Sequence, residues 1–152
     1  MIVYFSRSKK TEIFAKTLAD MINMPIFELR SDLGQLPTHR FVLRLLRLFM
    51  GFGKCSVIEL PKALPGRIFV CSPVWAGGFA LPVRHFLQNA NLTDVEVNVL
   101  LTAAAPTESH ARKAEAFLHR TPCKIGKVHI FATSSGAMPE VHTIRAHMKE
   151  LM

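Results

Sequence analysis

The residues of this chain best suited to chemistry form a hydroxyl-rich, basic loop close to the start of the sequence. The loop follows the apolar run 2–5 and contains Ser6, Arg7, Ser8, Lys9, Lys10 and Thr11. A helical pattern begins directly after it, so backbone N–H groups and the positive end of the helix dipole would point at the same place. A strand, a loop and a helix in this order are typical of α/β proteins that hold a phosphorylated cofactor.

A second distinctive loop, SPVWAGGFALP at residues 72–82, follows another apolar run. It contains Trp75, whose flat face suits dispersion contact with a planar ring. It also contains Gly77 and Gly78, which lack a Cβ and so let their backbone amides approach a ligand closely. Together the two loops indicate one ligand with an anionic tail and a flat head.

Each of these signals also has a purely structural interpretation. Serine and threonine in such loops commonly cap helices, and a lone tryptophan after a strand often serves packing. His110 and His142 lie near the expected site loops and are candidates for substrate-side groups, as are the neighbouring Glu108 and Glu140. No Ser-His-Asp or Cys-His arrangement and no metal-ligand spacing is visible, so we predict no catalytic side chain and no metal site.

The three cysteines, Cys55, Cys71 and Cys123, are few and far apart. Cys71 lies within an apolar run and is expected to be a core residue. Such cysteine usage, with no membrane-spanning stretch and no signal peptide pattern, predicts a cytoplasmic protein.

The elements that must position the loops alternate along the chain. Short β-forming runs predict strands at residues 2–5, 26–29, 67–71, 95–101 and 127–133. Apolar residues at helical spacing predict helices at 13–22, 38–52, 82–90, 111–118 and 141–151. Five alternations predict a single α/β domain over residues 1–152, with a parallel sheet covered on both faces.

The segment from Thr38 to Phe52 is unusual, because it is apolar on nearly every side apart from a stripe of Arg40, Arg44 and Arg47. One interpretation is a buried helix whose guanidinium groups reach solvent. A second is an interface helix that meets a partner subunit, and a third is contact with an anionic membrane surface. The segment is too short and too charged to span a bilayer.

The amino-acid composition is that of a globular protein, with 49% hydrophobic and 20% charged residues, and the net charge is +8. Such a charge favours anionic partners or surfaces. The basic residues are spread along the chain, and only one Tyr and one Trp are present, so no nucleic-acid partner is expected.

Two segments carry a family resemblance. YFSRSKKTEIFAKTLA resembles the phosphate-binding opening of flavodoxin-like proteins, and SPVWAGGFALPVRHFL resembles the segment of that family that receives the isoalloxazine ring of FMN. The resemblance implies a flavodoxin-like three-layer α/β/α sandwich with a five-stranded parallel sheet in the order 2-1-3-4-5. In that order the loops after the first and third strands are neighbours, at the point where the strand order reverses.

The resemblance also implies the cofactor, FMN, and the residues around it. The phosphate would lie among Ser6, Arg7, Ser8, Lys9, Lys10 and Thr11. The flavin ring would lie against Pro73, Val74, Trp75, Ala76, Gly77 and Gly78, with Thr102, Ala103 and Ala104 as the far wall.

The chain departs from the family pattern at Lys9-Lys10, where Gly-Asn is usual. Without the glycine, a turn with positive φ is harder to form. The two ammonium groups could pair with the phosphate or simply be solvated. A run of alanines, Ala103 to Ala105, also replaces a segment that is often glycine-rich or aromatic.

Three functions are compatible with these features. The first is an FMN-dependent reductase that takes hydride from NAD(P)H and reduces quinone-like acceptors, with residues 38–52 serving a homodimer. The second is a small electron-transfer carrier, although a charge of +8 would require an acidic redox partner protein. The third is a flavodoxin-fold protein that has lost flavin and acts as a binding module.

Overall fold

Strands and helices alternate along the part of the chain that the structure describes. The computed structural model describes residues 1–50 and 61–133. In chain order the elements are β1 (Ile2–Tyr4), α1 (Lys10–Ile22), β2 (Ile26–Glu28), the 3-10 helix η1 (Asp32–Gln35), α2 (Thr38–Phe49), β3 (Arg67–Trp75), β4 (Gly78–Phe79), α3 (Leu81–Asn89), β5 (Glu96–Ala103), α4 (Glu108–Leu118) and β6 (Lys124–Ala132).

Five parallel strands form the sheet in the order β2-β1-β3-β5-β6, and the short β4 pairs antiparallel with β3. The predicted order 2-1-3-4-5 is therefore confirmed, with β5 and β6 as the fourth and fifth parallel strands. The strand order reverses between β1 and β3. The carboxyl ends of both strands lie at the same edge of the sheet, which is where α/β proteins of this kind bind ligands.

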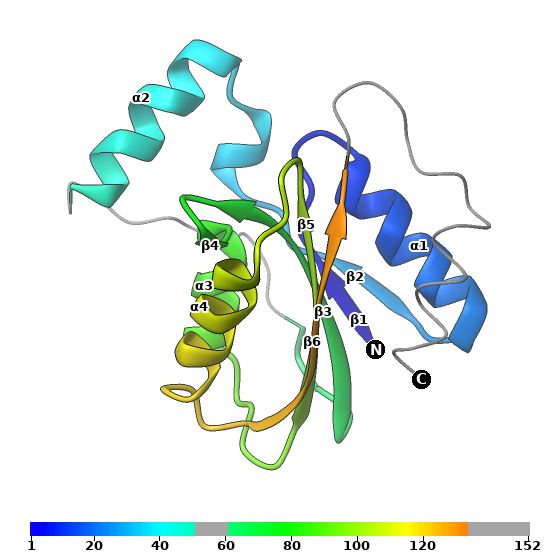
Figure 1. Cartoon of the computed structure of the whole chain (residues 1–152). Helices are drawn as coiled ribbons and strands as arrows, with labels where there is room; N and C mark the ends of the chain where they lie inside the picture. Colours follow the sequence, from blue (N-terminus) through cyan, green and yellow to red (C-terminus); the bar gives the residue numbers. More distant parts are fainter. Residues whose placement is uncertain (51–60, 134–152) are drawn as a thin grey trace.

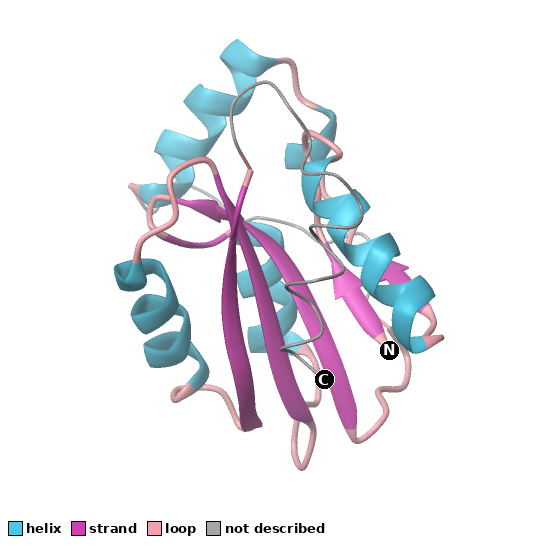
Figure 2. Cartoon of the chain, turned by 45° about the vertical axis from the view of Figure 1, so that its right-hand side comes forward, coloured by secondary structure: helices cyan, strands magenta, loops and turns pink. Residues whose placement is uncertain are grey.

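The sheet has helices on both faces, which confirms the predicted three layers. Figures 1 and 2 show α1 on one face and α3 and α4 on the other. Alternate residues of β1 serve the two faces. Ile2 and Tyr4 belong to the core with Phe14 of α1, while Val3, and Phe5 just after the strand, belong to the core with α3 and α4. This alternation follows from the two-residue repeat of a strand.

The β5–β6 pairing contains one irregularity, between Val97 and Val99. At this point the side chain of Asn98 turns into the sheet, and its Oδ1 accepts a hydrogen bond from the backbone N–H of Lys127 at 2.9 Å. A Cβ on Gly126 would lie only 2.4 Å from the same Oδ1. The hydrogen bond between Asn98 and Lys127 therefore requires a residue without a side chain at position 126.

The expectation of a loop over residues 72–82 is wrong for residues 72–79. β3 continues to Trp75, and β4 folds back on it with the pairs Val74–Phe79 and Trp75–Gly78. The two residues between the strands, Ala76 and Gly77, have φ values of 48° and 81°. Two consecutive positive φ values are the requirement of the tight turn that best matches strand twist, so the chain forms a hairpin here.

The helix α2 lies beyond the edge of the sheet in both views (Figures 1 and 2), outside the two helix layers. Phe41 is buried, but Val42, Leu43, Leu46 and Met50 are 47%, 62%, 55% and 69% exposed. The interpretation of this segment as a buried helix is therefore wrong.

The predicted end of the α2 segment, Phe52, lies outside the described residues, as does the predicted helix at 141–151. None of the helices within 1–50 and 61–133 is both long and apolar enough to cross a membrane.

Candidate functional site

The loop after β1 carries two buried polar atoms that have no hydrogen-bond partner among the described residues. They are the hydroxyl oxygen of Ser6 and the Nε of Arg7. The other end of the Arg7 side chain is anchored, since its Nη2 donates to the carbonyl of Leu36 at 3.4 Å and to the hydroxyl of Thr38 at 3.3 Å. An unpaired buried donor is costly, so these atoms indicate a place where an external acceptor would bind.

The loop ends in a left-handed turn at the start of α1. Lys9, the residue that caps the helix, has φ 63° and ψ −9°, and its side chain makes no capping hydrogen bond. The positive-φ turn, which is harder to form without glycine, therefore forms with lysine in its place, at a conformational cost. The first N–H groups of any helix lack partners within the helix, so the start of α1 is open to an anion.

Two side chains in the first turn of α1 already have partners. The hydroxyls of Thr11 and Thr102 are 2.8 Å apart and buried, which ties α1 to the end of β5. The Glu12 carboxylate pairs with Lys16 at 2.6 Å, one turn further along the helix. This pairing offsets the one acidic charge in the first turn, where it would otherwise repel a bound anion.

The loop after β1 and the end of β3 meet in an aromatic cluster. Trp75, half-buried, makes edge contacts with Phe5 at 5.3 Å and with Phe41 of α2 at 5.0 Å between ring centroids. The Arg7 guanidinium lies over the Phe41 ring, 4.2 Å from its centroid. Trp75 thus has a packing role, and Arg7 is held between the first loop and α2.

Sequence reasoning missed Phe41 as a neighbour of the site. Apolar residues occur on nearly every side of α2, so the pattern did not indicate which one faces the first loop. Only the position of α2 in the folded chain identifies it.

The glycines of the β3–β4 hairpin differ in their surroundings. A Cβ on Gly78 would meet nothing within 4 Å, so the backbone there borders open space. A Cβ on Gly77 would lie 2.8 Å from the Nζ of Lys113, which extends from α4 toward the turn. A ligand could therefore approach the hairpin backbone closely at Gly78, whereas the Lys113 side chain lies next to the backbone at Gly77.

The third loop begins at the end of β5, next to the first two. Thr102 and Ala103 are buried in the strand, and Ala104 is exposed just beyond it. β5 pairs with β3 up to the register Pro73–Thr102. The structure thus brings together the three predicted groups of site residues, 6–11, 73–78 and 102–104, at one edge of the sheet.

Of the further candidates, His110 has a structural role: its Nδ1 accepts a hydrogen bond from the backbone N–H of Thr107 at 3.3 Å, at the start of α4. Glu108 is exposed and pairs with Arg112 at 3.4 Å. Glu140 and His142 lie outside the described residues.

The ionisable core groups near the sheet are held in their neutral forms. Burial raises the pKa of the Cys71 thiol to about 12. Burial, with smaller contributions from Glu28 and Glu12, raises the pKa of Tyr4 to about 12. A thiol with so high a pKa is a poor nucleophile near neutral pH, and Cys71 is a core residue as predicted.

Within the described part of the chain no group of three or more His, Cys, Asp or Glu side chains could hold a metal ion. The site therefore offers hydroxyls, guanidinium and ammonium groups, backbone amides and an aromatic wall. Such a set suits an anionic, partly planar ligand.

Comparison with protein-family models and with curated proteins finds no match in sequence. Solved structures do match in fold. A protein from Bacteroides eggerthii described as a flavoprotein has a TM-score of 0.74 and 13% identity, covering 98% of this chain and 94% of its own. A Lactobacillus acidophilus flavoprotein, solved in complex with FMN, has a TM-score of 0.67 and 19% identity over 85% of this chain and 90% of its own.

A flavodoxin from Streptococcus pneumoniae covers 99% of this chain and 94% of its own, with a TM-score of 0.55 and 13% identity. At these identities the similarity establishes the fold.

Proposed function

We propose that this chain, whose fold is that of the flavodoxin-like flavoproteins, binds FMN at the edge of the sheet where β1, β3 and β5 end. The phosphate would lie among Ser6, Arg7, Ser8, Lys9, Lys10 and Thr11. The ring would lie against the hairpin residues Pro73, Val74, Trp75, Ala76, Gly77 and Gly78, with Thr102, Ala103 and Ala104 beside it. When bound, FMN would supply the redox chemistry, and the protein would supply binding, orientation and electrostatics.

The observation that carries this proposal is the pair of buried donors in the first loop. The Ser6 hydroxyl and the Arg7 Nε have no partner in the described chain, and both residues belong to the loop that leads into the start of α1. Phosphate oxygens accept hydrogen bonds and carry negative charge, so they would satisfy both donors and interact favourably with the helix dipole. In this proposal Thr11 contributes its backbone N–H, because its hydroxyl already pairs with Thr102.

The ring end of the proposed site rests on the hairpin backbone. The space beside Gly78 is open, so a planar edge can approach the backbone there. Trp75 is half-buried against Phe5 and Phe41, and its remaining surface would border the ring.

Titrations with FMN and with riboflavin, which lacks the phosphate, test the proposal. We expect the apoprotein to bind FMN at least about tenfold more tightly than riboflavin, because only FMN reaches the donors of the first loop. In Arg7→Gln this preference should largely disappear, while riboflavin affinity changes little. Quenching of flavin fluorescence measures all four dissociation constants.

Arg67→Gln is the matched control. It removes the same charge at the start of β3, where Arg67 pairs with Glu96 at 3.0 Å, away from the carboxyl ends of the strands. This variant should keep the full preference for FMN. Equal affinities of the unmodified protein for FMN and riboflavin would contradict the assignment of the phosphate site, and no flavin binding at all would support a flavin-free binding module.

Among redox roles we favour an NAD(P)H-dependent reductase of quinone-like acceptors. The net charge of +8 suits anionic small molecules such as NAD(P)H. It suits an electron carrier only if the partner protein is acidic. NAD(P)H oxidation by the FMN-loaded protein that depends on added quinone would support the reductase, whereas no NAD(P)H oxidation would favour the carrier.

A further inference from the structure

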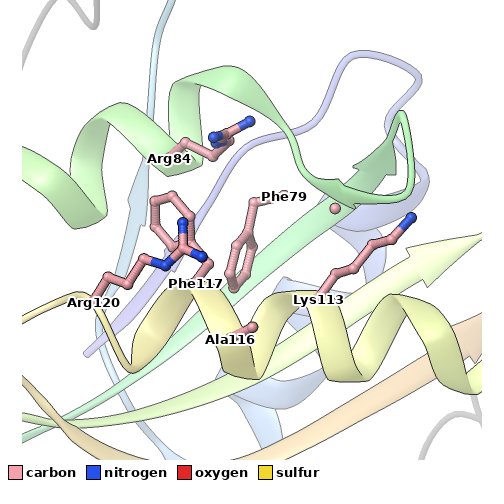
Figure 3. A pocket seen from close by; sticks show the side chains of 7 residues that line it. Phe79, Arg84, Lys113, Ala116, Phe117 and Arg120 are labelled. Atoms are coloured by element: carbon pink, nitrogen blue, oxygen red, sulfur yellow. The ribbon is translucent and has the colours of Figure 1, made fainter.

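A separate cleft lies between β4, α3 and α4 (Figure 3). Its volume is about 270 Å³, and its walls carry three cationic and two aromatic side chains: Arg84, Lys113, Arg120, Phe79 and Phe117. None of these five residues belongs to the proposed FMN site, but Gly78, which does, also lines the cleft. The cleft is large enough for a small molecule.

The three cations around the cleft lack a carboxylate partner among residues 1–50 and 61–133. Elsewhere in the same part of the chain several exposed cations do have one, including Arg67 with Glu96, Arg112 with Glu108 and Lys124 with Asp94. Positive charges that gather at a concave surface without compensation raise the local concentration of anions.

The floor of the cleft is aromatic. The rings of Phe79 and Phe117 meet edge to face with centroids 5.7 Å apart, and the Arg84 guanidinium lies 5.2 Å from the centroid of Phe117. Phe79 is 3% exposed, so this floor is continuous with the core. The cleft thus combines an apolar surface with positive charge at its rim.

The cations are not evenly distributed along the cleft. Figure 3 shows Arg84 and Arg120 at the end near Phe117, while Lys113 lies at the opposite end, close to the hairpin. Lys113 and Phe117 share one face of α4, since they are four residues apart, and Arg120 lies in the turn that follows the helix. The neighbouring positions Ala114 and Leu118 are buried in the core, which fixes the direction of this face.

We propose that this cleft binds a phosphate monoester that carries a single aromatic ring. Two guanidinium groups at one end suit a phosphate, because each can donate two parallel hydrogen bonds to its oxygens and the phosphate carries nearly two negative charges. The aromatic group would lie on Phe79 and Phe117, toward Lys113. The proposal does not require FMN binding at the edge of the sheet, although Gly78 borders both sites.

Phenyl phosphate, inorganic phosphate and phenol are the probes, titrated into the full-length protein and followed by amide chemical shifts and calorimetry. We expect phenyl phosphate to bind at least about tenfold more tightly than either of the other two, because only it engages both the cations and the aromatic floor. The shifts should concentrate on α3, β4 and α4.

Arg84→Gln and Arg120→Gln should each weaken phenyl phosphate binding about tenfold. Arg112→Gln is the matched control, because Arg112 lies on α4 next to Lys113 but pairs with Glu108 and does not line the cleft. Circular dichroism establishes that each variant is folded.

Three outcomes would overturn the proposal. They are equal weakening by Arg112→Gln, equal affinity for phenol and phenyl phosphate, or shifts that concentrate on residues 6–11. Saturation with FMN distinguishes the two sites, since phenyl phosphate binding that persists in FMN-loaded protein belongs to the cleft. Should FMN fail to bind, the titration of the apoprotein still tests the cleft.

Discussion

Lys9 shows how a single residue can depart from a family pattern without removing the local structure. The resemblance to flavodoxin-like proteins places glycine here, yet Lys9 occupies the left-handed region with φ 63°. This conformation costs a residue with a Cβ about 1 kcal/mol, and favourable contacts elsewhere in the fold can offset that amount. The shape of the loop is therefore retained, and a flexible cation is added at its rim.

Gly126 should tolerate no side chain. Gly126→Ala would place a Cβ 2.4 Å from Asn98 Oδ1, so Asn98 would have to move and give up its hydrogen bond from Lys127. We expect the free energy of unfolding to fall by about 2 kcal/mol, as measured by urea denaturation.

Gly66→Ala serves as the control for that change, because a Cβ at Gly66 meets nothing within 4 Å. This variant should be neutral or slightly stabilising, by up to about 1 kcal/mol, since alanine restricts the unfolded chain. Equal effects of the two substitutions would show that the packing around Asn98 does not constrain position 126.

Among the elements, α2 contacts the proposed site through Phe41, which is buried. Phe41 packs on Trp75 and under the Arg7 guanidinium, whereas Leu43, two positions further along, is 62% exposed. We expect Phe41→Ala to lower the free energy of unfolding by about 3 kcal/mol and Leu43→Ala to change it by less than about 0.5 kcal/mol. Denaturant unfolding of the two variants checks this, and similar losses would mean that Leu43 is buried in solution.

The outer face of α2 remains the best candidate for the proposed homodimer contact. It presents Val42, Leu43, Leu46 and Met50, which are all exposed, on one side of the helix. The β3–β4 hairpin is the second element with an unexpected role, because it contributes to the proposed flavin site on one side and to the basic cleft on the other.

At the scale of the whole molecule, the Cys71 thiol should make the protein less stable at alkaline pH. Burial raises the pKa of this thiol to about 12 from an ordinary value of 9.0. Above pH 9 the unfolded chain loses the proton while the folded chain keeps it, so stability falls as the pH rises. We expect a loss of about 1.4 kcal/mol from this group between pH 8 and pH 10, measured by urea unfolding at both values.

Cys71→Ala removes the titrating group. The free energy of unfolding should then differ less between pH 8 and pH 10, by that amount. Tyr4 contributes in the same direction only at higher pH, because its ordinary pKa is 10.0. An unchanged pH dependence in the alanine variant would contradict the burial of the Cys71 thiol.

The order of the elements, the parallel sheet and its three layers could be predicted from the sequence, because they depend on patterns that are local in the chain. Apolar runs specify strands, helical spacing specifies amphipathic helices, and alternation of the two favours parallel pairing. The two loops of the proposed site could be recognised for the same reason, since their hydroxyls, cations, glycines and tryptophan are contiguous in sequence.

Other features depend on contacts between distant residues, and only the tertiary structure decided them. The position of α2 beyond the sheet, and hence the contact of Phe41 with Trp75, follows from packing that no periodicity encodes. The hairpin at Ala76 and Gly77 forms only if β4 can hydrogen-bond to a free edge of β3, which the local sequence does not specify. The basic cleft arises because α3 and α4 pack side by side and place Arg84 over Phe117, which is distant from it in the chain.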